Sequence, residues 1–269
     1  MRLEIKQIND GKPEAAIIIP VADMQDEITT SCLDHLRKVT KLPLEIVLVE
    51  SSGNEFAFGK SVNAGIRAAE QNQILIGLDS DAYPYPGSIE KLVSCVRNDS
   101  RVGYAAAMVY SDDVSPRVGW VLSDLPWFLC SLMRKGPTYA YRRMLMGKWW
   151  SFGVKPVSKY EEGKMVGAQT TMFALRRECY DDVGPIDERY RVSLVDVDYC
   201  FRILISKDWY LTSCPSAPIY HKYHATQHAY GWEKTYDAWR IYLENWPRAR
   251  FRLVRNAAAR GKFLIPKEI

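Results

Sequence analysis

The stretch ILIGLDSDAYP, residues 74–84, places two carboxylates, Asp79 and Asp81, directly after an apolar run. Ile74–Leu78 has the length and composition of a buried β-strand, and Pro84 ends it. Asp and Ser are common in turns, so the pair is compatible with an ordinary surface turn. Carboxylate oxygens are also the ligands that Mg²⁺ takes beside a bound phosphate, so the pair is equally compatible with a cation site. The elements around the pair decide between these two interpretations.

The first 110 residues alternate between strand-like and helix-like patterns. Three further apolar runs predict strands at 15–21, 44–49 and 102–110, and helical spacing predicts helices at 26–39, 60–70 and 88–97. This order predicts an α/β fold with a mostly parallel sheet flanked by helices. Ligands of such sheets bind beyond the carboxyl ends of the strands. Glu50 follows one strand as Asp79 follows another, so a binding site is favoured over a turn.

The alternation is less regular beyond residue 116. The predicted elements are a strand at 170–175, a helix that ends at Gly184, a helix at 196–205, a strand at 209–214 and one or two basic helices from about residue 235. In the first half, Asp26 and Ser88 are the predicted N-caps of the helices at 26–39 and 88–97, because short oxygen-bearing side chains satisfy the first free N–H groups of a helix.

The composition is that of a globular protein, with 47% hydrophobic and 25% charged residues among 269. No apolar stretch reaches the roughly 20 residues that span a bilayer, and acidic residues interrupt the first 20 positions where a signal peptide would be apolar. A cytoplasmic location is therefore expected, with peripheral membrane contact as an alternative. Six scattered cysteines without a C-x-x-C pair argue against a zinc knuckle and a disulfide framework, and most are expected to be buried thiols.

Six segments, in this order, resemble the family 2 glycosyltransferases of the GT-A fold. They are AAIIIPV (15–21), VLVESSGN (47–54), FGKSVNAGIRAAEQNQILIGLDSDAYPYPGSIEKLV (58–93), TMFALRRECYDDVGPIDERY (171–190), LVDVDYCFRI (194–203) and IYHKYH (219–224). The resemblance implies a Rossmann-like catalytic domain over 1–230, with a nucleotide-sugar-binding half at 1–110 and an acceptor half at 111–230. It leaves two basic parts outside the shared pattern, an aromatic insertion at 116–160 and a helical C-terminal extension at 231–269.

The resemblance also implies a metal site and a donor site. Asp79 and Asp81 resemble the DxD motif that, together with His221, would hold Mn²⁺ or Mg²⁺ against a nucleotide-sugar diphosphate, and His224 is the alternative to His221. Glu50 stands where the family usually has the Asp that binds the nucleobase, and a UDP-sugar is the expected donor. The residues expected to contact the donor are Pro20, Val21, Glu50, Ser52, Lys60, Asn63, Asp79 and Ser80.

Asp196 resembles the general base that would take a proton from an acceptor hydroxyl, so that one in-line displacement inverts the sugar configuration. Asp198 is the alternative base, because Val195 stands where the family usually has Glu. That departure also leaves open a catalytically silent relative that only binds a nucleotide or a polyanion. A sugar-1-phosphate nucleotidyltransferase is disfavoured, since residues 20–27 read PVADMQDE and lack the glycine-rich loop of that class.

The acceptor is not indicated by the resemblance. Residues 116–160 contain eight Lys and Arg against one acidic residue, and residues 231–269 contain nine against four. Trp120, Trp127, Trp149 and Trp150 lie in the first of these segments. Aromatic and basic side chains together fit a glycan acceptor, a lipid-linked glycan at an anionic membrane, or a polyanion such as a modified nucleic acid. A helical lid that packs its Trp residues on the catalytic domain is the alternative.

Overall fold

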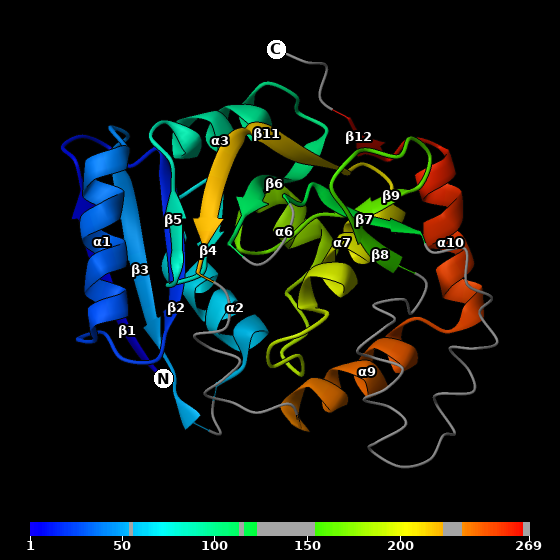
Figure 1. Ribbon diagram of the computed structural model, residues 1–269, viewed down its shortest axis with the longest axis horizontal. Coiled ribbons are helices and arrows are strands. Elements are labelled where there is room, and N and C mark those ends of the chain that lie inside the picture. The colour runs from blue at the N-terminus through cyan, green and yellow to red at the C-terminus, as the bar shows by residue number, and fades with distance from the viewer. Residues whose placement is uncertain (54–55, 113–115, 123–153, 223–232, 266–269) are drawn as a thin grey trace.

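A nine-stranded sheet with helices on both faces forms the body of the chain in the computed structural model (Figure 1). The structure describes residues 1–53, 56–112, 116–122, 154–222 and 233–265. The strands of the large sheet are β1 (Arg2–Ile8), β2 (Ala15–Val21), β3 (Leu44–Glu50), β4 (Ile74–Leu78), β5 (Ala82–Pro84), β6 (Val102–Tyr110), β10 (Met172–Arg176), β11 (Tyr210–His221) and β12 (Phe263–Leu264). The second sheet contains β7 (Gly119–Leu122), β8 (Val154–Val157) and β9 (Met165–Gly167). The helices are α1 (Glu27–Val39), α2 (Phe58–Ala68), α3 (Ser88–Arg97), α6 (Arg177–Val183), α7 (Val195–Ile205), α9 (Glu233–Asn245) and α10 (Arg248–Ala259).

Six of the nine described strands of the large sheet run in one direction, as the predicted parallel arrangement requires, although parallel and antiparallel pairs are equal in number. Its order is β1-β3-β2-β4-β10-β6-β11-β12, and β5 pairs with the end of β11. β3, β2, β4, β6, β11 and β12 point the same way, whereas β1, β5 and β10 run antiparallel to their neighbours. The carboxyl ends of β2, β3, β4 and β11 therefore meet at one edge of the sheet.

Two hydrophobic layers hold the sheet between the helices. In β2 and β3, Ile17 and Ile46 face the layer that α1 and α3 cover, whereas Ile18 and Val47 face the layer of α2 and α7. All four side chains are fully buried. Because both faces of these strands are covered, their sequences are continuous apolar runs without polar alternation.

The structure confirms two predicted helix ends and corrects one. Asp26 is the N-cap of α1 and accepts a hydrogen bond of 2.6 Å from the Thr29 N–H. Gly184 ends α6 with a φ of 84°, a conformation that favours glycine. The prediction for Ser88 is wrong, because Gly87 is the N-cap of α3 and the Ser88 hydroxyl donates instead to the Pro218 carbonyl at 2.7 Å.

The sequence did not predict how two strands, β1 and β10, pair in the large sheet. β1 extends the sheet beyond β3 as an antiparallel edge strand. β10, predicted as a strand, lies antiparallel between β4 and β6 and joins the two parallel halves of the sheet. Neither position has a local sequence signal, because each depends on pairing between segments far apart in the chain.

β11 is longer than predicted and carries a disulfide. The strand continues from Tyr210 to His221, with a register shift between Cys214 and Pro218 against β6. Cys214 forms a disulfide with Cys95 of α3, so the expectation of a free thiol is wrong for this pair. Three other cysteines are free and buried, as predicted: Cys32, Cys179 and Cys200.

The C-terminal helices pack on the preceding part of the described chain. α9 and α10 lie along the side of the molecule that carries α7 (Figure 1). Tyr242 of α9, Trp246 in the connection and Val254 of α10 are fully buried in the same hydrophobic layer as Phe201 of α7. Over its described part, the predicted helical extension at 231–269 therefore shares one core with the preceding residues.

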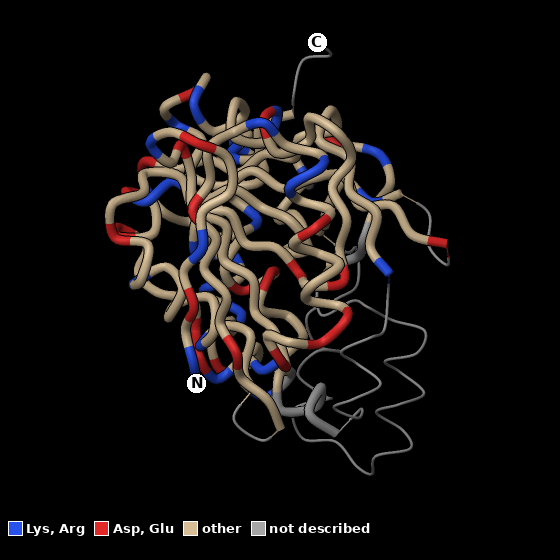
Figure 2. Tube along the Cα trace, turned by 90° about the vertical axis from the view of Figure 1, so that its left-hand side faces the viewer, with Lys and Arg blue, Asp and Glu red and all other residues tan. Residues whose placement is uncertain are grey.

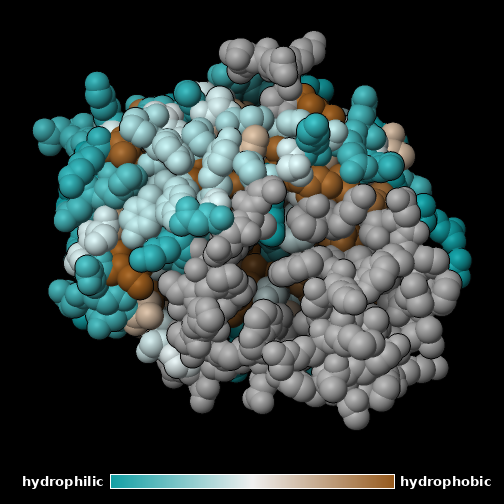
Figure 3. All heavy atoms as spheres, viewed as in Figure 1, coloured by the Kyte–Doolittle hydropathy of each residue, from teal (hydrophilic) through white to brown (hydrophobic). Residues whose placement is uncertain are grey.

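The described surface is hydrophilic and mixed in charge. Acidic and basic positions are interspersed along the trace (Figure 2). On the face shown in Figure 3, hydrophilic residues cover most of the described part and hydrophobic ones form only small patches. None of the described helices combines the length and the apolar character needed to cross a membrane.

Candidate active site

Asp79, Asp81 and His221 form an acidic cluster at the carboxyl edge of the sheet. The two aspartates follow β4, and His221 ends β11, where the short strand β5 pairs with it. The His221 Nε2 atom lies 3.1 Å from Asp81 Oδ1 and 3.7 Å from Asp79 Oδ2. One ligand atom from each residue lies within 4.8 Å of the others, a spacing that a divalent cation can bridge. The fold thus brings together the three residues predicted to be metal ligands.

Burial and the neighbouring charges act in opposite directions on the pKa values of this cluster. The pKa of Asp79 is raised from 3.8 to about 7. Burial is the largest cause, the charges of Asp81 and Asp196 act in the same direction, and the nearby His221 acts against them. Burial alone would lower the pKa of His221, but the hydrogen bond to Asp81 and the two carboxylate charges raise it above 6.5. A bound cation would replace the protons that these groups hold near neutral pH.

Thr171 supports the cluster and was not predicted as a site residue. Its hydroxyl lies 3.4 Å from the His221 Nδ1 atom, and its carbonyl accepts the Asp79 N–H at 3.0 Å. A polar pair, Thr170-Thr171, directly before the apolar strand β10 is the sequence signal that could have indicated it.

Asp196 lies in the first turn of α7 and is held from two sides. The Trp120 indole N–H donates to its Oδ2 at 3.0 Å, and the Val197 N–H donates to its Oδ1 at 2.9 Å. Burial raises the pKa of Asp196 to about 6, and these two hydrogen bonds act in the opposite direction. The charge of Asp196 also contributes to raising the pKa of Asp79, so the carboxylate predicted as base lies within electrostatic range of a predicted metal ligand. Trp120 was predicted only as part of the basic aromatic segment.

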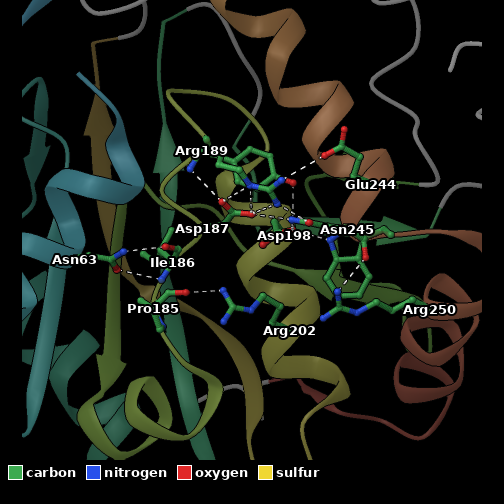
Figure 4. A network of polar contacts seen from close by, with 12 residues as sticks. Asn63, Pro185, Ile186, Asp187, Arg189, Asp198, Arg202, Glu244, Asn245 and Arg250 are labelled. Atoms are coloured by element: carbon green, nitrogen blue, oxygen red, sulfur yellow. Dashed lines mark hydrogen bonds and ion pairs between the residues drawn. The ribbon is translucent and has the colours of Figure 1, made fainter. Parts of the chain in front are cut away.

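Asp198, the alternative base, has a structural position instead. It is 1% exposed, and its Oδ1 accepts hydrogen bonds from the Tyr190 hydroxyl (3.2 Å), the Asn245 amide (2.9 Å) and the Trp246 indole (2.7 Å). Figure 4 shows this carboxylate between α7 and the C-terminal helices. The burial and these three donors favour Asp196 as the base.

Asn63, one of the residues expected to contact the donor, makes several hydrogen bonds within the protein. Its amide donates to the Ile186 carbonyl (2.8 Å) and to Glu188 (3.1 Å), and its oxygen accepts from the Tyr180 hydroxyl (3.1 Å) and the Ile186 N–H (3.0 Å). Both ends of the amide are used within the protein (Figure 4). Asn63 therefore fixes the loop after α6 to α2, and the expectation of a nucleotide contact is not supported.

Most of the remaining predicted donor residues lie at the ends of β2, β3 and β4, whereas Lys60 lies in the first turn of α2. Glu50 Oε2 accepts the Met24 N–H at 3.0 Å, which fixes this carboxylate beside the end of β2. Pro20 and Val21 are buried, Ser52 and Lys60 are exposed, and Ser80 is half-buried. The alternative ligand His224 and three tryptophans of the basic aromatic segment lie outside the described residues: Trp127, Trp149 and Trp150.

Comparison with solved structures gives matches at low identity. The structure of GalNAc-T7 with UDP, GalNAc and Mn²⁺ has 11% identity and a TM-score of 0.45, and the match covers 78% of this chain and 44% of that one. A197 from STIV has 13% identity and a TM-score of 0.47, over 78% and 86% of the two chains. The catalytic domain of Drosophila β1,4-galactosyltransferase 7 in complex with xylobiose has 15% identity and a TM-score of 0.46, over 76% and 65%. The chain thus spans less than half the length of the first of these structures.

Comparison with protein families gives a match over most of the chain. No curated protein matches it. Residues 16–184 match the model described as Glycosyl transferase family 2. This range runs from the first parallel strand through the Asp79–Asp81 pair to the end of α6, and covers more than half of the 269 residues. The chain therefore belongs to glycosyl transferase family 2.

Proposed function

We propose that this protein is a metal-dependent inverting glycosyltransferase that moves a sugar from a nucleoside-diphosphate donor, a UDP-sugar, to an acceptor hydroxyl. The observation that carries this proposal is the cluster of Asp79, Asp81 and His221, with Asp196 within electrostatic range of Asp79. A transferase of this kind needs a cation site for the diphosphate and a base for the acceptor, and these four residues are the candidates for the two roles.

Asp79, Asp81 and His221 would hold the cation. Two carboxylates and an imidazole suit Mn²⁺. Mg²⁺ is the alternative, because it favours oxygen ligands and the two carboxylates supply them. The bound ion would stabilise the negative charge of the departing diphosphate as a Lewis acid. Thr171 assists by its contact with the far nitrogen of the His221 ring, which fixes the ring orientation.

Asp196 would accept the proton of the acceptor hydroxyl. A pKa of about 6 leaves it mostly ionised at neutral pH yet more basic than an ordinary aspartate. The Trp120 and Val197 N–H groups orient the carboxylate. A correctly placed base contributes about 10²–10⁴ to the rate. Attack from the side opposite the diphosphate in one displacement gives inversion.

Glu50 would accept a hydrogen bond from the nucleobase. One of its oxygens is held by the Met24 N–H, which leaves the other carboxylate oxygen to take the imide N–H of uracil. The acceptor remains one of the three predicted classes: a glycan, a lipid-linked glycan or a polyanion. The cytoplasmic location and the peripheral membrane contact also stay predictions.

A second candidate is a catalytically silent relative that binds a nucleotide or a polyanion. Val195, directly before Asp196, is the observation in its favour, because the family usually has Glu there. The two candidates differ in turnover rather than in donor binding, so both have to be measured on the same protein.

A thermal-shift panel would test the proposal. UDP-, GDP-, dTDP- and CMP-linked sugars are each combined with Mn²⁺, Mg²⁺ or EDTA, on wild type, Asp81→Ala and the surface control Asp34→Ala. A ligand at 100 times its Kd stabilises by about 2.7 kcal/mol, which is a few degrees for a chain of this size. We expect a Mn²⁺-dependent shift with UDP-sugars that Asp81→Ala loses and Asp34→Ala keeps.

The second part of the test separates the two candidates. Release of UDP from the bound donor, with water as the acceptor, is measured in wild type and Asp196→Asn. The transferase is supported if wild type releases UDP and Asp196→Asn lowers the rate of release by about 10²-fold or more while donor binding stays unchanged. Binding without release in wild type favours the silent relative. If no donor shifts the Tm with any metal, the proposal is wrong.

A further inference from the structure

We infer that Asn245 and Trp246, at the junction of the two C-terminal helices, are positioning residues for Asp196 and act through the buried Asp198. The inference rests on the proposed function, because it assigns these residues to the reaction that Asp196 would assist. It makes the C-terminal helices part of the catalytic unit rather than a separable binding module.

The carboxylate of Asp198 joins α7 to the C-terminal helices. Two of its three hydrogen bonds come from the junction, from the Asn245 amide at 2.9 Å and the Trp246 indole at 2.7 Å. The third comes from the Tyr190 hydroxyl, in the loop before α7, at 3.2 Å. A buried carboxylate is costly without such donors, so the three bonds fix both partners with respect to α7.

Packing holds the indole of Trp246 in addition to its hydrogen bond. The side chain is fully buried, and its ring meets Phe201 of α7 edge to face at 5.0 Å, with an interplanar angle of 89°. The Arg250 guanidinium covers the ring at 4.5 Å from its centroid. The N–H that reaches Asp198 therefore has little freedom to move.

Asn245 extends the connection to the loop before α7. Its amide also donates to Asp187 at 3.0 Å, and its oxygen accepts from Arg189 at 2.8 Å. Arg189 in turn pairs with Asp187 at 2.6 Å and with Glu244 of α9 at 3.3 Å. Figure 4 shows these side chains as one polar layer between α7 and α9.

On its other side the same loop is fixed to α2. The Asn63 amide holds Ile186 through two hydrogen bonds, and the Phe58 N–H donates to the Arg191 carbonyl at 2.8 Å. The loop that leads into α7 is therefore held between the donor half of the sheet and the C-terminal junction.

The first turn of α7 needs this support. Leu194, the residue before the helix, has a φ of 64°, and no side chain caps the helix. A non-glycine residue in this left-handed conformation persists only when its surroundings hold it there. The Leu194 carbonyl accepts the Asp198 N–H at 2.9 Å, so the turn closes at the residue that the junction binds.

Asp196 lies inside that turn. Its Oδ1 accepts the N–H of Val197, so the direction of the carboxylate depends on the backbone of the first turn. Loosening Asp198 would let the turn relax and move the carboxylate away from the acceptor. Since a displacement of 1 Å can cost about 10²-fold in rate, the junction has a measurable effect on turnover without touching the substrate.

Trp246→Phe tests the inference in the full-length protein. It removes the indole N–H and keeps an aromatic ring against Phe201. Trp209→Phe is the matched control, because the Trp209 indole donates a bond of 2.9 Å to Asp182, outside this network. Two readouts are compared, UDP release from a UDP-sugar with Mn²⁺ and hydrogen–deuterium exchange of the peptide amides 194–198. Asn245→Ala is the second variant should Trp246→Phe not fold.

In Trp246→Phe we expect kcat to fall about tenfold or more, KM for the donor to stay within twofold, and exchange at 194–198 to rise. In Trp209→Phe neither kcat nor this exchange should change. Equal effects of the two variants, or unchanged exchange in Trp246→Phe, would overturn the inference. Without UDP release by wild type the proposed function fails, and the exchange readout alone then decides whether the junction holds the turn.

Discussion

Asp79→Asn should make the metal-free protein more stable at pH 8. Burial raises the pKa of the Asp79 carboxyl from 3.8 to about 7, with His221 acting against this and the Asp81 and Asp196 charges adding to it. The folded state therefore binds this proton more tightly than the unfolded state does. The stability that the proton provides is fully present below about pH 4 and is lost as the pH rises through 7. Asparagine has the same shape and no charge, so it avoids that loss.

The size of the gain follows from the two pKa values. The step from 3.8 to about 7, at about 1.36 kcal/mol for each unit, corresponds to about 4 kcal/mol at pH 8. The Asp79 side chain is 26% exposed and interacts with two other carboxylates, so we expect between about 1 and 4 kcal/mol. The gain should shrink toward zero as the pH falls to 4, where the wild-type carboxyl is protonated in both states.

Urea unfolding in EDTA at pH 4.5, 6, 7 and 8 measures this free energy. Asp34→Asn on α1 is the control, because its side chain is 64% exposed and should change the free energy by less than about 0.5 kcal/mol. With Mn²⁺ the order should reverse, since wild type gains stability from the ion and Asp79→Asn does not. A variant that is less stable than wild type at pH 8 in EDTA, or a gain equal at all four pH values, would refute the reasoning.

Three further changes test other parts of the site and the core. Trp120→Phe removes a hydrogen bond to the ionised Asp196, so the pKa of Asp196 should rise. The acidic limb of the pH–rate profile for UDP release should then move up by about one pH unit from near 6, and an unmoved limb contradicts this. Glu50→Gln replaces the oxygen proposed for the nucleobase, and UDP binding measured by calorimetry should weaken about tenfold. Gly77→Ala should lower the free energy of unfolding by about 1–3 kcal/mol in urea, because a Cβ there would lie 2.2 Å from the Phe173 ring.

The sequence predicts the parallel half of the sheet well because its signals are local. The strands at 15–21, 74–78 and 102–110 have the predicted bounds, since a strand buried on both faces must be a continuous apolar run. The carboxylates at the strand ends follow from the same pattern. The convergence of Asp79, Asp81 and His221 required the family resemblance, because His221 lies 140 residues beyond Asp81 and reaches it only through the β5–β11 pairing.

What the sequence did not predict depends on distant pairing. The antiparallel insertion of β10 and the Cys95–Cys214 disulfide join segments that carry no mark of their partners. Asp198 is the clearest case in the site. It lies two residues from Asp196 and is also acidic, so it stays an alternative base on sequence alone, because the Trp246 indole that donates to it lies 48 residues later in the chain.

Two carboxylates of this chain, Asp198 and Asp79, differ in the number of hydrogen-bond donors that the protein offers them. Asp198 accepts three hydrogen bonds on one oxygen, and these offset part of the effect of burial, which raises its pKa. For Asp79, His221 at 3.7 Å is the cationic group within reach among the described residues, while two other carboxylates oppose its ionisation. Unfavourable charges of this kind are typical of functional sites, where a bound ion or ligand can stabilise them. Removal of this one carboxylate should therefore stabilise the metal-free protein and weaken the binding of a divalent cation, so stability and metal binding should change in opposite directions.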